Sequence, residues 1–178
     1  MIFEVLKLDK TDRKIITLLQ ENPKVTHSEI AKKIRVSQPT VGIRIKKLTK
    51  KGILRVQPGI NLKKVALFLA TVEIKSRNPR DIIKMVRSCP FMLNAFHLSG
   101  DHDVFIFLVS TKLEKLYNIV DYHFRKNPEV DSVSMEIVTE IAKDFILPID
   151  LEAEKLSPTS EKGCGEKCTY NFNTTRID

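Results

Sequence analysis

Hydrophobic positions in the first third of the chain recur every three or four residues, which is the spacing of one face of a helix. In residues 37–52, Val41, Ile45 and Leu48 form one narrow apolar stripe, and the opposite side carries lysines and the isolated Ile43. A charged surface helix is the simplest interpretation of such a segment. An isoleucine among lysines instead favours a helix that has both a core face and a ligand face.

The ends of this helix are marked in the sequence. Ser37 is a suitable N-cap, and because Pro39 has no N–H, the Ser37 hydroxyl is expected to accept from the N–H of Thr40. Gly52 follows the last turn and can take the left-handed conformation that ends a helix.

Two shorter helices are predicted before it. The first covers residues 8–20, with Asp9 as N-cap and Asp12 at the third position. The second covers residues 26–34, where Thr26 and Glu29 have the spacing of a capping box. A two-residue turn at 35–36 then leads to the basic helix. This order is a helix-turn-helix, whose last member lies in the major groove of DNA.

On this interpretation the basic helix reads double-stranded DNA. A glutamine can pair with an adenine edge, an isoleucine can contact a thymine methyl, and lysines position the helix on phosphates. Arg44 flanks the apolar stripe, so either a phosphate contact or a brace to the core is open for it. Residues 53–57 alternate like a short strand, a possible wing. The candidate DNA-binding residues are Ser37, Gln38, Pro39, Thr40, Ile43, Arg44, Lys46, Lys47 and Lys50.

The charge supports a polyanionic partner for this third of the chain. The 178 residues carry a net charge of +8. Residues 1–61 hold 14 Lys and Arg against 5 acidic residues, whereas residues 62–178 hold 16 against 17. One module is therefore expected to meet a polyanion and the other is not.

The remaining two thirds predict a β-α-β-β-α-β order, an α+β ferredoxin-like sheet with both helices on one face. The third strand is apolar at every position from Val104 to Val109, whereas a sheet with one wet face should alternate. No spare element is evident to cover the second face, so we expect a homodimer through the sheet. The expected elements are strands at 65–74, 91–99, 103–110 and 131–141 and helices at 79–90 and 112–125.

Several motifs together resemble the Lrp/AsnC (leucine-responsive, feast/famine) transcription regulators. They are Asp9-x-x-Asp12-x-x-Ile15, Glu29-Ile30-Ala31, Ser37-x-x-Thr40-Val41-x-x-Arg44-Ile45-x-x-Leu48, Gly52-Ile53 and Gly100-x-x-Asp103. Arg35 departs from the family, which usually has a glycine between the two helices. The resemblance covers residues 8–147. It implies a DNA-binding domain at 1–57, a linker at 58–64 and a RAM-type dimerisation and effector domain at 65–150. Residues 151–178 fall outside the family pattern and form a Cys-containing tail.

The resemblance also implies a small-molecule effector, often an amino acid, bound near the loop between the two central strands. In that family dimers assemble further, into tetramers or octamers. The alternative for Gly100 and Asp103 is a purely structural hairpin turn. The implied effector residues are Ser99, Gly100, Asp101, His102 and Asp103, with Ser134 and Glu136 as weaker candidates.

The sequence contains no glycine-rich phosphate loop, nucleophile elbow or HExxH metal motif, so we expect a regulator and no enzyme. The main rival is a tetrapyrrole (sirohaem) decarboxylase of similar architecture, for which His97, His102 and His123 would be the relevant histidines. An architectural DNA-packing protein is a third hypothesis, and it predicts DNA binding without sequence preference.

No cofactor is expected, and the cysteines are the weakest candidates for chemistry. Cys164 and Cys168 are four apart, which is half of a zinc site or a redox pair, while Cys89 stands alone. Thiol or metal sensing by this tail is a hypothesis; a flexible segment with reduced thiols is the alternative. The chain shows no export signal and no apolar run long enough for a bilayer, which predicts a cytoplasmic protein without a membrane partner.

Overall fold

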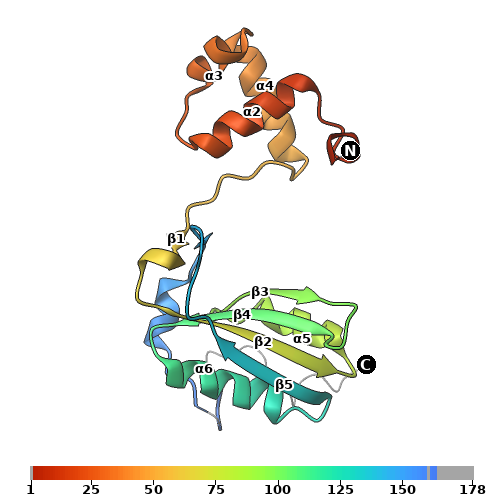
Figure 1. Cartoon of the computed structure of the whole chain (residues 1–178), viewed down its shortest axis with the longest axis vertical. Coiled ribbons are helices and arrows are strands. Elements are labelled where there is room, and N and C mark those ends of the chain that lie inside the picture. The colour runs from red at the N-terminus through yellow and green to blue at the C-terminus, as the bar shows by residue number, and fades with distance from the viewer. Residues whose placement is uncertain (1, 160, 164–178) are drawn as a thin grey trace. The chain divides into compact units, whose positions relative to one another are not determined.

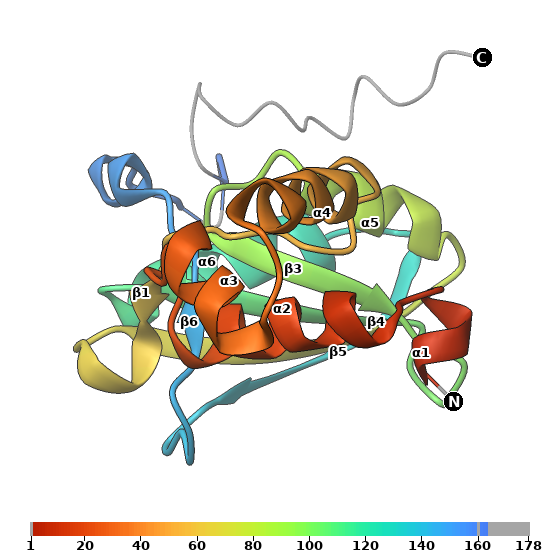
Figure 2. The same cartoon turned by 90° about the horizontal axis from the view of Figure 1, so that it is seen from above.

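A computed structural model describes residues 2–159 and 161–163 of the chain. It divides into two compact units, residues 1–57 and residues 58–178. The N-terminal unit contains the short α1 (Ile2–Val5) and a group of three helices, α2 (Lys10–Glu21), α3 (His27–Ile34) and α4 (Gln38–Lys50) (Figures 1 and 2). Its core is built where these helices meet, around the fully buried Ile15, Ile30 and Val41.

The three helices begin at the residues that the sequence predicts. Asp9 and Asp12 form a capping box at the start of α2. Thr26 and Glu29 form another at the start of α3, and these hydrogen bonds from Thr26 lower the pKa of the Glu29 carboxyl. The hydroxyl of Ser37 accepts from the Thr40 N–H at 3.3 Å, as expected. Each cap joins residues three apart in the sequence, which is why local pattern is enough to find it.

Three residues of this unit have a positive φ in the left-handed region; they are Lys7, Arg35 and Gly52. Gly52 has φ of +69° just after α4, which confirms its predicted role as the helix stop. Arg35 has φ of +58° between α3 and α4. The backbone therefore keeps the turn geometry for which glycine is suited, although the side chain is an arginine.

The short strand expected at residues 53–57 is not formed. The N–H groups of Ile53 and Leu54 instead donate to the carbonyl oxygen of Leu48, at 3.1 and 3.3 Å. The N–H groups that a strand would use for pairing at its start are therefore already bonded to the end of α4. In the described part of this unit no other strand is present to pair with residues 53–57.

The C-terminal unit has the predicted β-α-β-β-α-β order. Its four-stranded antiparallel sheet runs β3-β4-β2-β5, and the first face of the sheet packs against α5 and α6 (Figure 1). A π-helical turn (Asp121–Arg125) extends α6. The bounds are β2 (Phe68–Ser76), α5 (Pro79–Val86), β3 (Met92–His97), β4 (Val104–Ser110), α6 (Leu113–Val120) and β5 (Val130–Ile137).

The second face of this sheet is covered at one end by the same chain, which corrects the expectation that no element was available. β1 (Ile60–Asn61) pairs with β6 (Ile146–Leu147), and a 3-10 turn (Leu62–Lys64) follows β1. A cluster on this face contains Leu62, Leu69 and Val109 together with side chains from residues 138–149. Most of the segment expected to be a linker at 58–64 is therefore structured against the sheet domain.

Residues 150–159 and 161–163, which include the described start of the Cys-containing tail, pack on the C-terminal unit. Leu151–Lys155 form a 3-10 turn that buries Ala153 in the main core. Pro158 is buried, and its carbonyl oxygen accepts from the side chain of Asn118 at 2.9 Å. Thr159 and Gly163 form an isolated antiparallel bridge. We call residues 150–163 the C-terminal strap.

Glu154 fastens the strap to α6 and the end of β4. Its carboxylate accepts from the Thr111 hydroxyl at 2.5 Å and from the Lys115 ammonium at 2.9 Å. Burial opposes ionisation of Glu154, but these hydrogen bonds outweigh it and lower its pKa to about 2. Lys115 is itself almost fully buried, so the strap neutralises a charge at the edge of the core.

Cys164 and Cys168 lie outside the described residues, and Cys89 is partly buried against the main core. Among the described residues, no helix has the length and the apolar character that a bilayer span requires.

Candidate DNA-binding and effector sites

α4 turns one face to the core and presents the other to solvent. Val41 is fully buried and Leu48 is 3 % exposed, which confirms the predicted stripe. Ile43 is 69 % exposed on the other side. The lysines expected to surround Ile43 are exposed as well; they are Lys46, Lys47 and Lys50. An apolar side chain bordered by cations has the chemistry of a base-methyl contact flanked by phosphate contacts.

The N-terminal end of α4 is held by its own side chains. The hydroxyls of Ser37 and Thr40 lie 2.7 Å apart and share a hydrogen bond, so both groups shape the cap. Gln38 and Pro39, between them, are exposed. The first turn of α4 therefore offers Gln38 as its one exposed side chain that can both donate and accept, next to the partly positive end of the helix dipole.

Arg44 points to α2. Its guanidinium donates to Asp9 at 2.5 Å and to Asp12 at 2.8 Å. These hydrogen bonds raise the pKa of Arg44 above its ordinary value, and the pKa of Asp9 is lowered by the backbone N–H of Asp12 and by Arg44. The sequence left two roles open for Arg44, a contact to DNA phosphate and a structural contact to the core. The hydrogen bonds to Asp9 and Asp12 match the structural role.

The loop after β3 is held by Asp103. Its carboxylate accepts from the Ser76 N–H at 2.8 Å, and its own N–H donates to the carbonyl oxygen of Ile74 at 2.9 Å. Asp103 therefore ties the β3–β4 hairpin to β2, in agreement with the structural alternative for this residue. Ser99, Gly100 and Asp101, the preceding residues, are exposed.

His102 of this loop contacts Glu73, a candidate site residue that the sequence analysis did not identify. Its Nδ1 lies 3.4 Å from the carboxylate of Glu73 on β2. Glu73 is paired with Phe105 on one side and Ser134 on the other, so all three side chains share the second face of the sheet. Glu136 pairs with Thr71 and lies on that face too. The signal was present in the alternation of β2, where Thr71 and Glu73 interrupt the apolar positions.

Beside this polar group lies an aromatic cluster. The rings of Phe105 and Phe107 meet edge to face with centroids 5.0 Å apart, and Phe96 contacts both at 6.3 Å. Phe96 is 45 % exposed. Phe107 also packs on Phe145, with centroids 5.8 Å apart, and belongs to the covered end of the second face. The part of this face around Phe96 remains open in the monomer.

The three histidines of the decarboxylase alternative occupy different surroundings. His123 is fully buried in the helical layer, and burial lowers its pKa to about 4. His97 is exposed on β3, and His102 faces Glu73. In residues 2–159 and 161–163, no group of three or more His, Cys, Asp or Glu side chains is arranged to hold a metal.

Comparison with known families matches both units. The profile described as winged helix-turn-helix DNA-binding matches residues 8–55. The profile of the Lrp/AsnC ligand binding domain matches residues 67–146. The two matched segments contain the three-helix group and the sheet domain, in this order.

Known relatives and solved structures are similar to this protein over most of its chain. The HTH-type transcriptional regulator LrpA of Pyrococcus horikoshii is 27 % identical over 140 residues, which cover 76 % of this chain and 99 % of LrpA. A transcriptional regulator of Neisseria meningitidis, solved with L-Met, aligns with a TM-score of 0.68 and 27 % identity over 79 % of this chain and 96 % of its own. E. coli AsnC shares the fold, with a TM-score of 0.65 and 19 % identity over 78 % and 96 %. The chain belongs to the Lrp/AsnC family and is a DNA-binding transcriptional regulator of that type.

Proposed function

We propose that this protein is a homodimer that recognises a specific DNA sequence through α4 and responds to a small amino acid-like molecule at the sheet domain. The proposal assigns base contacts to Gln38 and Ile43. It assigns phosphate contacts to the exposed lysines of α4 and a bracing role to Arg44.

The observation that carries the DNA assignment is the 69 % exposure of Ile43 on the face of α4 opposite the core. Exposing an isoleucine in water is unfavourable by about 1.5–3 kcal/mol relative to full burial. Thymine methyl groups in the major groove offer an apolar partner for such a side chain. Lys46, Lys47 and Lys50 would add the salt-dependent part of the affinity.

The homodimer rests on the open part of the second sheet face. Phe96 is almost half exposed there, and it contacts Phe105 and Phe107, of which Phe107 also packs on Phe145 at the covered end. A second copy of the same face is self-complementary under two-fold symmetry. A dimer would also present two α4 helices to a palindromic operator. Assembly of dimers into tetramers or octamers is part of the proposal on the strength of the family alone.

The effector assignment rests on the polar group next to the β3–β4 loop. Gly100 and Asp101 expose backbone and carboxylate groups there, and Glu73 with His102 supplies a carboxylate and an imidazole. An amino acid needs an acceptor for its ammonium and donors for its carboxylate. Ser134 and Glu136 on β5 extend this set, whereas Asp103 is assigned to the loop itself.

Selection of bound sites from random DNA tests the central claim. The wild-type protein should enrich a two-fold symmetric site, with half-sites about one helical turn or a multiple of it apart. Ile43→Ala should relax the preference at the position it contacts, by about 1 kcal/mol or more. Unbiased recovery of DNA by the wild-type protein would contradict sequence-specific recognition and favour a packing protein.

Lys50→Ala provides a matched control for Ile43→Ala on the same exposed face. Loss of one phosphate contact should weaken binding to all sequences equally and reduce the salt slope by about one. Sedimentation of the wild type and of Phe96→Glu tests the dimer, since a charge in the open aromatic group should shift the equilibrium toward monomer. A monomeric wild type at micromolar concentration would contradict it.

A further inference from the structure

His27 is a polar residue of the N-terminal unit that the DNA assignment above does not use. It is the first residue of α3, and it is exposed. The other three histidines of the chain, His97, His102 and His123, belong to the unit that contains the sheet. His27 is therefore the one imidazole in residues 1–57.

The imidazole of His27 lies against the recognition helix. A Cβ added at Gly42, in the interior of α4, would lie 3.5 Å from Nδ1 and 3.8 Å from Cε1 of His27. Gly42 has no positive φ that would require a glycine, and a glycine weakens a helix interior. Packing explains the glycine better than backbone conformation does, because a side chain much longer than a methyl group would occupy the place of the imidazole.

This contact places His27 beside the face of α4 that is assigned to DNA. Gln38 and Lys46 lie one turn before and one turn after Gly42, on the same side of the helix, and both are exposed. In a helix-turn-helix the helix before the recognition helix crosses the DNA backbone. A side chain at the start of α3 that lies against α4 is therefore well placed for a phosphate at the edge of the groove.

The charged groups around His27 favour an anion as its partner. On α4, Lys46 is the charged residue on the side that meets the imidazole. On α3, the carboxylate of Glu29 is engaged in the helix cap, where it accepts from the N–H and the hydroxyl of Thr26 at 2.8 and 2.7 Å. The residues one turn further along α3 on the side of His27 are buried and apolar; they are Ile30 and Ala31.

We propose that His27 contacts a backbone phosphate of the operator as an imidazolium, and that the affinity for DNA therefore increases as the pH falls from 8 to 6. Histidine is the side chain whose ordinary charge change lies in this pH range. A phosphate contact fixes the position of the protein on the duplex without selecting bases. The inference rests on the proposed docking of α4 in the major groove.

The salt dependence of DNA binding measures such a contact. The logarithm of the binding constant falls linearly with the logarithm of the salt concentration, and each neutralised phosphate steepens the slope by about 0.9. For the full-length wild type on a site selected from random DNA, the slope should be steeper by about 0.9 at pH 6 than at pH 8. The affinity at 0.1 M salt should be at least about threefold higher at pH 6. His27→Ala should show the wild-type slope of pH 8 at both pH values.

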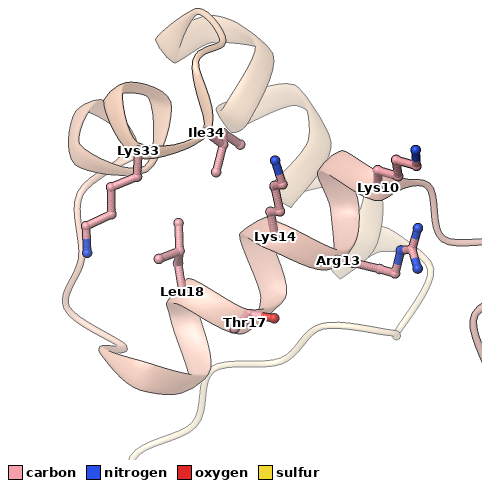
Figure 3. A pocket seen from close by; sticks show the side chains of 7 residues that line it. All are labelled: Lys10, Arg13, Lys14, Thr17, Leu18, Lys33 and Ile34. Atoms are coloured by element: carbon pink, nitrogen blue, oxygen red, sulfur yellow. The ribbon is translucent and has the colours of Figure 1, made fainter.

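His27→Lys tests whether charge is what the contact requires. Its ammonium keeps its charge over this pH range, so its slope should be as steep at pH 8 as at pH 6. Lys33→Ala is the matched control on α3, because Lys33 lines a pocket between α2 and α3 whose lining residues do not include His27 (Figure 3). Lys33→Ala should keep the difference in slope between the two pH values, and so should His97→Ala in the sheet domain.

Two outcomes would overturn the proposal. The wild-type slope could be the same at pH 6 and pH 8, or the difference in slope could persist in His27→Ala. Circular dichroism at both pH values shows whether each variant is folded, and His27→Gln repeats the test should His27→Ala unfold. A wrong orientation of α4 is a separate result, because it would appear as an unchanged site preference in Ile43→Ala.

Discussion

The guanidinium of Arg44 lies 2.8 Å from the carboxylate of Asp12, although 32 residues separate them in the chain. This contact and the one to Asp9 tie the middle of α4 to the first turn of α2. A recognition helix must keep a constant angle to the groove, and two hydrogen-bonded charge pairs restrict its rotation. The position of Ile43 on the outer face thus depends on a residue whose side chain points the other way.

Replacing Arg44 with alanine should therefore lower the stability of the fold, and any loss of DNA affinity should follow from that. Arg44→Ala removes two hydrogen bonds to carboxylates, and a loss of about 1–2 kcal/mol is expected in the free energy of unfolding. Lys46→Ala, on the exposed side of the same helix, should change stability by less than about 0.5 kcal/mol and reduce DNA affinity in a salt-dependent way. Urea denaturation and DNA titration of both variants check this. The brace is wrong if Arg44→Ala is as stable as the wild type.

Arg35→Gly should stabilise the protein. Arg35 holds φ of +58°, and the left-handed conformation is unfavourable by about 1 kcal/mol for a residue with a side chain. Glycine adopts it freely but loses more entropy on folding, so the expected net gain is about 0.5 kcal/mol. Thermal unfolding of the full chain measures the change, and a lower stability of Arg35→Gly would show that the arginine side chain makes a compensating contact.

Because the pKa of Glu154 is lowered in the folded chain, the free energy of unfolding should fall in acid. The pKa of this carboxyl in the folded chain is about 2, below the ordinary 4.5, because the hydrogen bonds from Thr111 and Lys115 outweigh the effect of burial. A carboxyl with a lowered pKa contributes its full stabilisation above pH 4.5 and loses it as the pH falls from about 4.5 to about 2. The contribution at neutral pH should be about 1–2 kcal/mol after allowance for solvent screening.

Glu154→Gln should remove this contribution and flatten the stability profile between pH 4.5 and 2. Glu152→Gln is the matched control, because Glu152 pairs with Lys155 at a highly exposed position of the same turn. Denaturant unfolding at a series of pH values distinguishes the two. A Glu154→Gln variant with the acid dependence of the wild type would mean that the strap is held by other contacts.

Gly163 and Gly100 should respond differently to alanine. Gly163 has φ of +55°, and an added Cβ would lie 2.6 Å from the ring of Tyr122. Gly163→Ala should therefore release the end of the C-terminal strap and speed trypsin cleavage after Lys155. No atom lies within 4 Å of a Cβ at Gly100, so Gly100→Ala should keep wild-type stability and trypsin resistance. Equal cleavage rates for Gly163→Ala and the wild type would contradict the packing against Tyr122.

Helices α2, α3 and α4 of the N-terminal unit were predictable because their signals are local. The caps at Asp9, Thr26 and Ser37 each bond a residue three positions later. The stripe of Val41 and Leu48 follows from helical periodicity. The order of the sheet domain followed in the same way from alternation and from breaks at proline and glycine. The strand expected at 53–57 failed because alternation over five residues does not reveal that the end of α4 takes up its N–H groups.

Contacts between distant segments decided the rest. Several charge pairs join residues that are 29–39 positions apart in the chain, and local periodicity does not specify such partners. They are Arg44 with Asp9 and Asp12, Glu73 with His102, and Glu154 with Lys115. The same holds for the segments that cover one end of the second sheet face, and for the pocket between α2 and α3. The sequence by itself determined which helix is basic, where α2, α3 and α4 begin, in which order the main elements of the sheet domain follow, and which family the chain resembles. Only the tertiary structure decided which charges are neutralised and which stay available for a ligand, because that depends on which side chains the packing brings within hydrogen-bond distance.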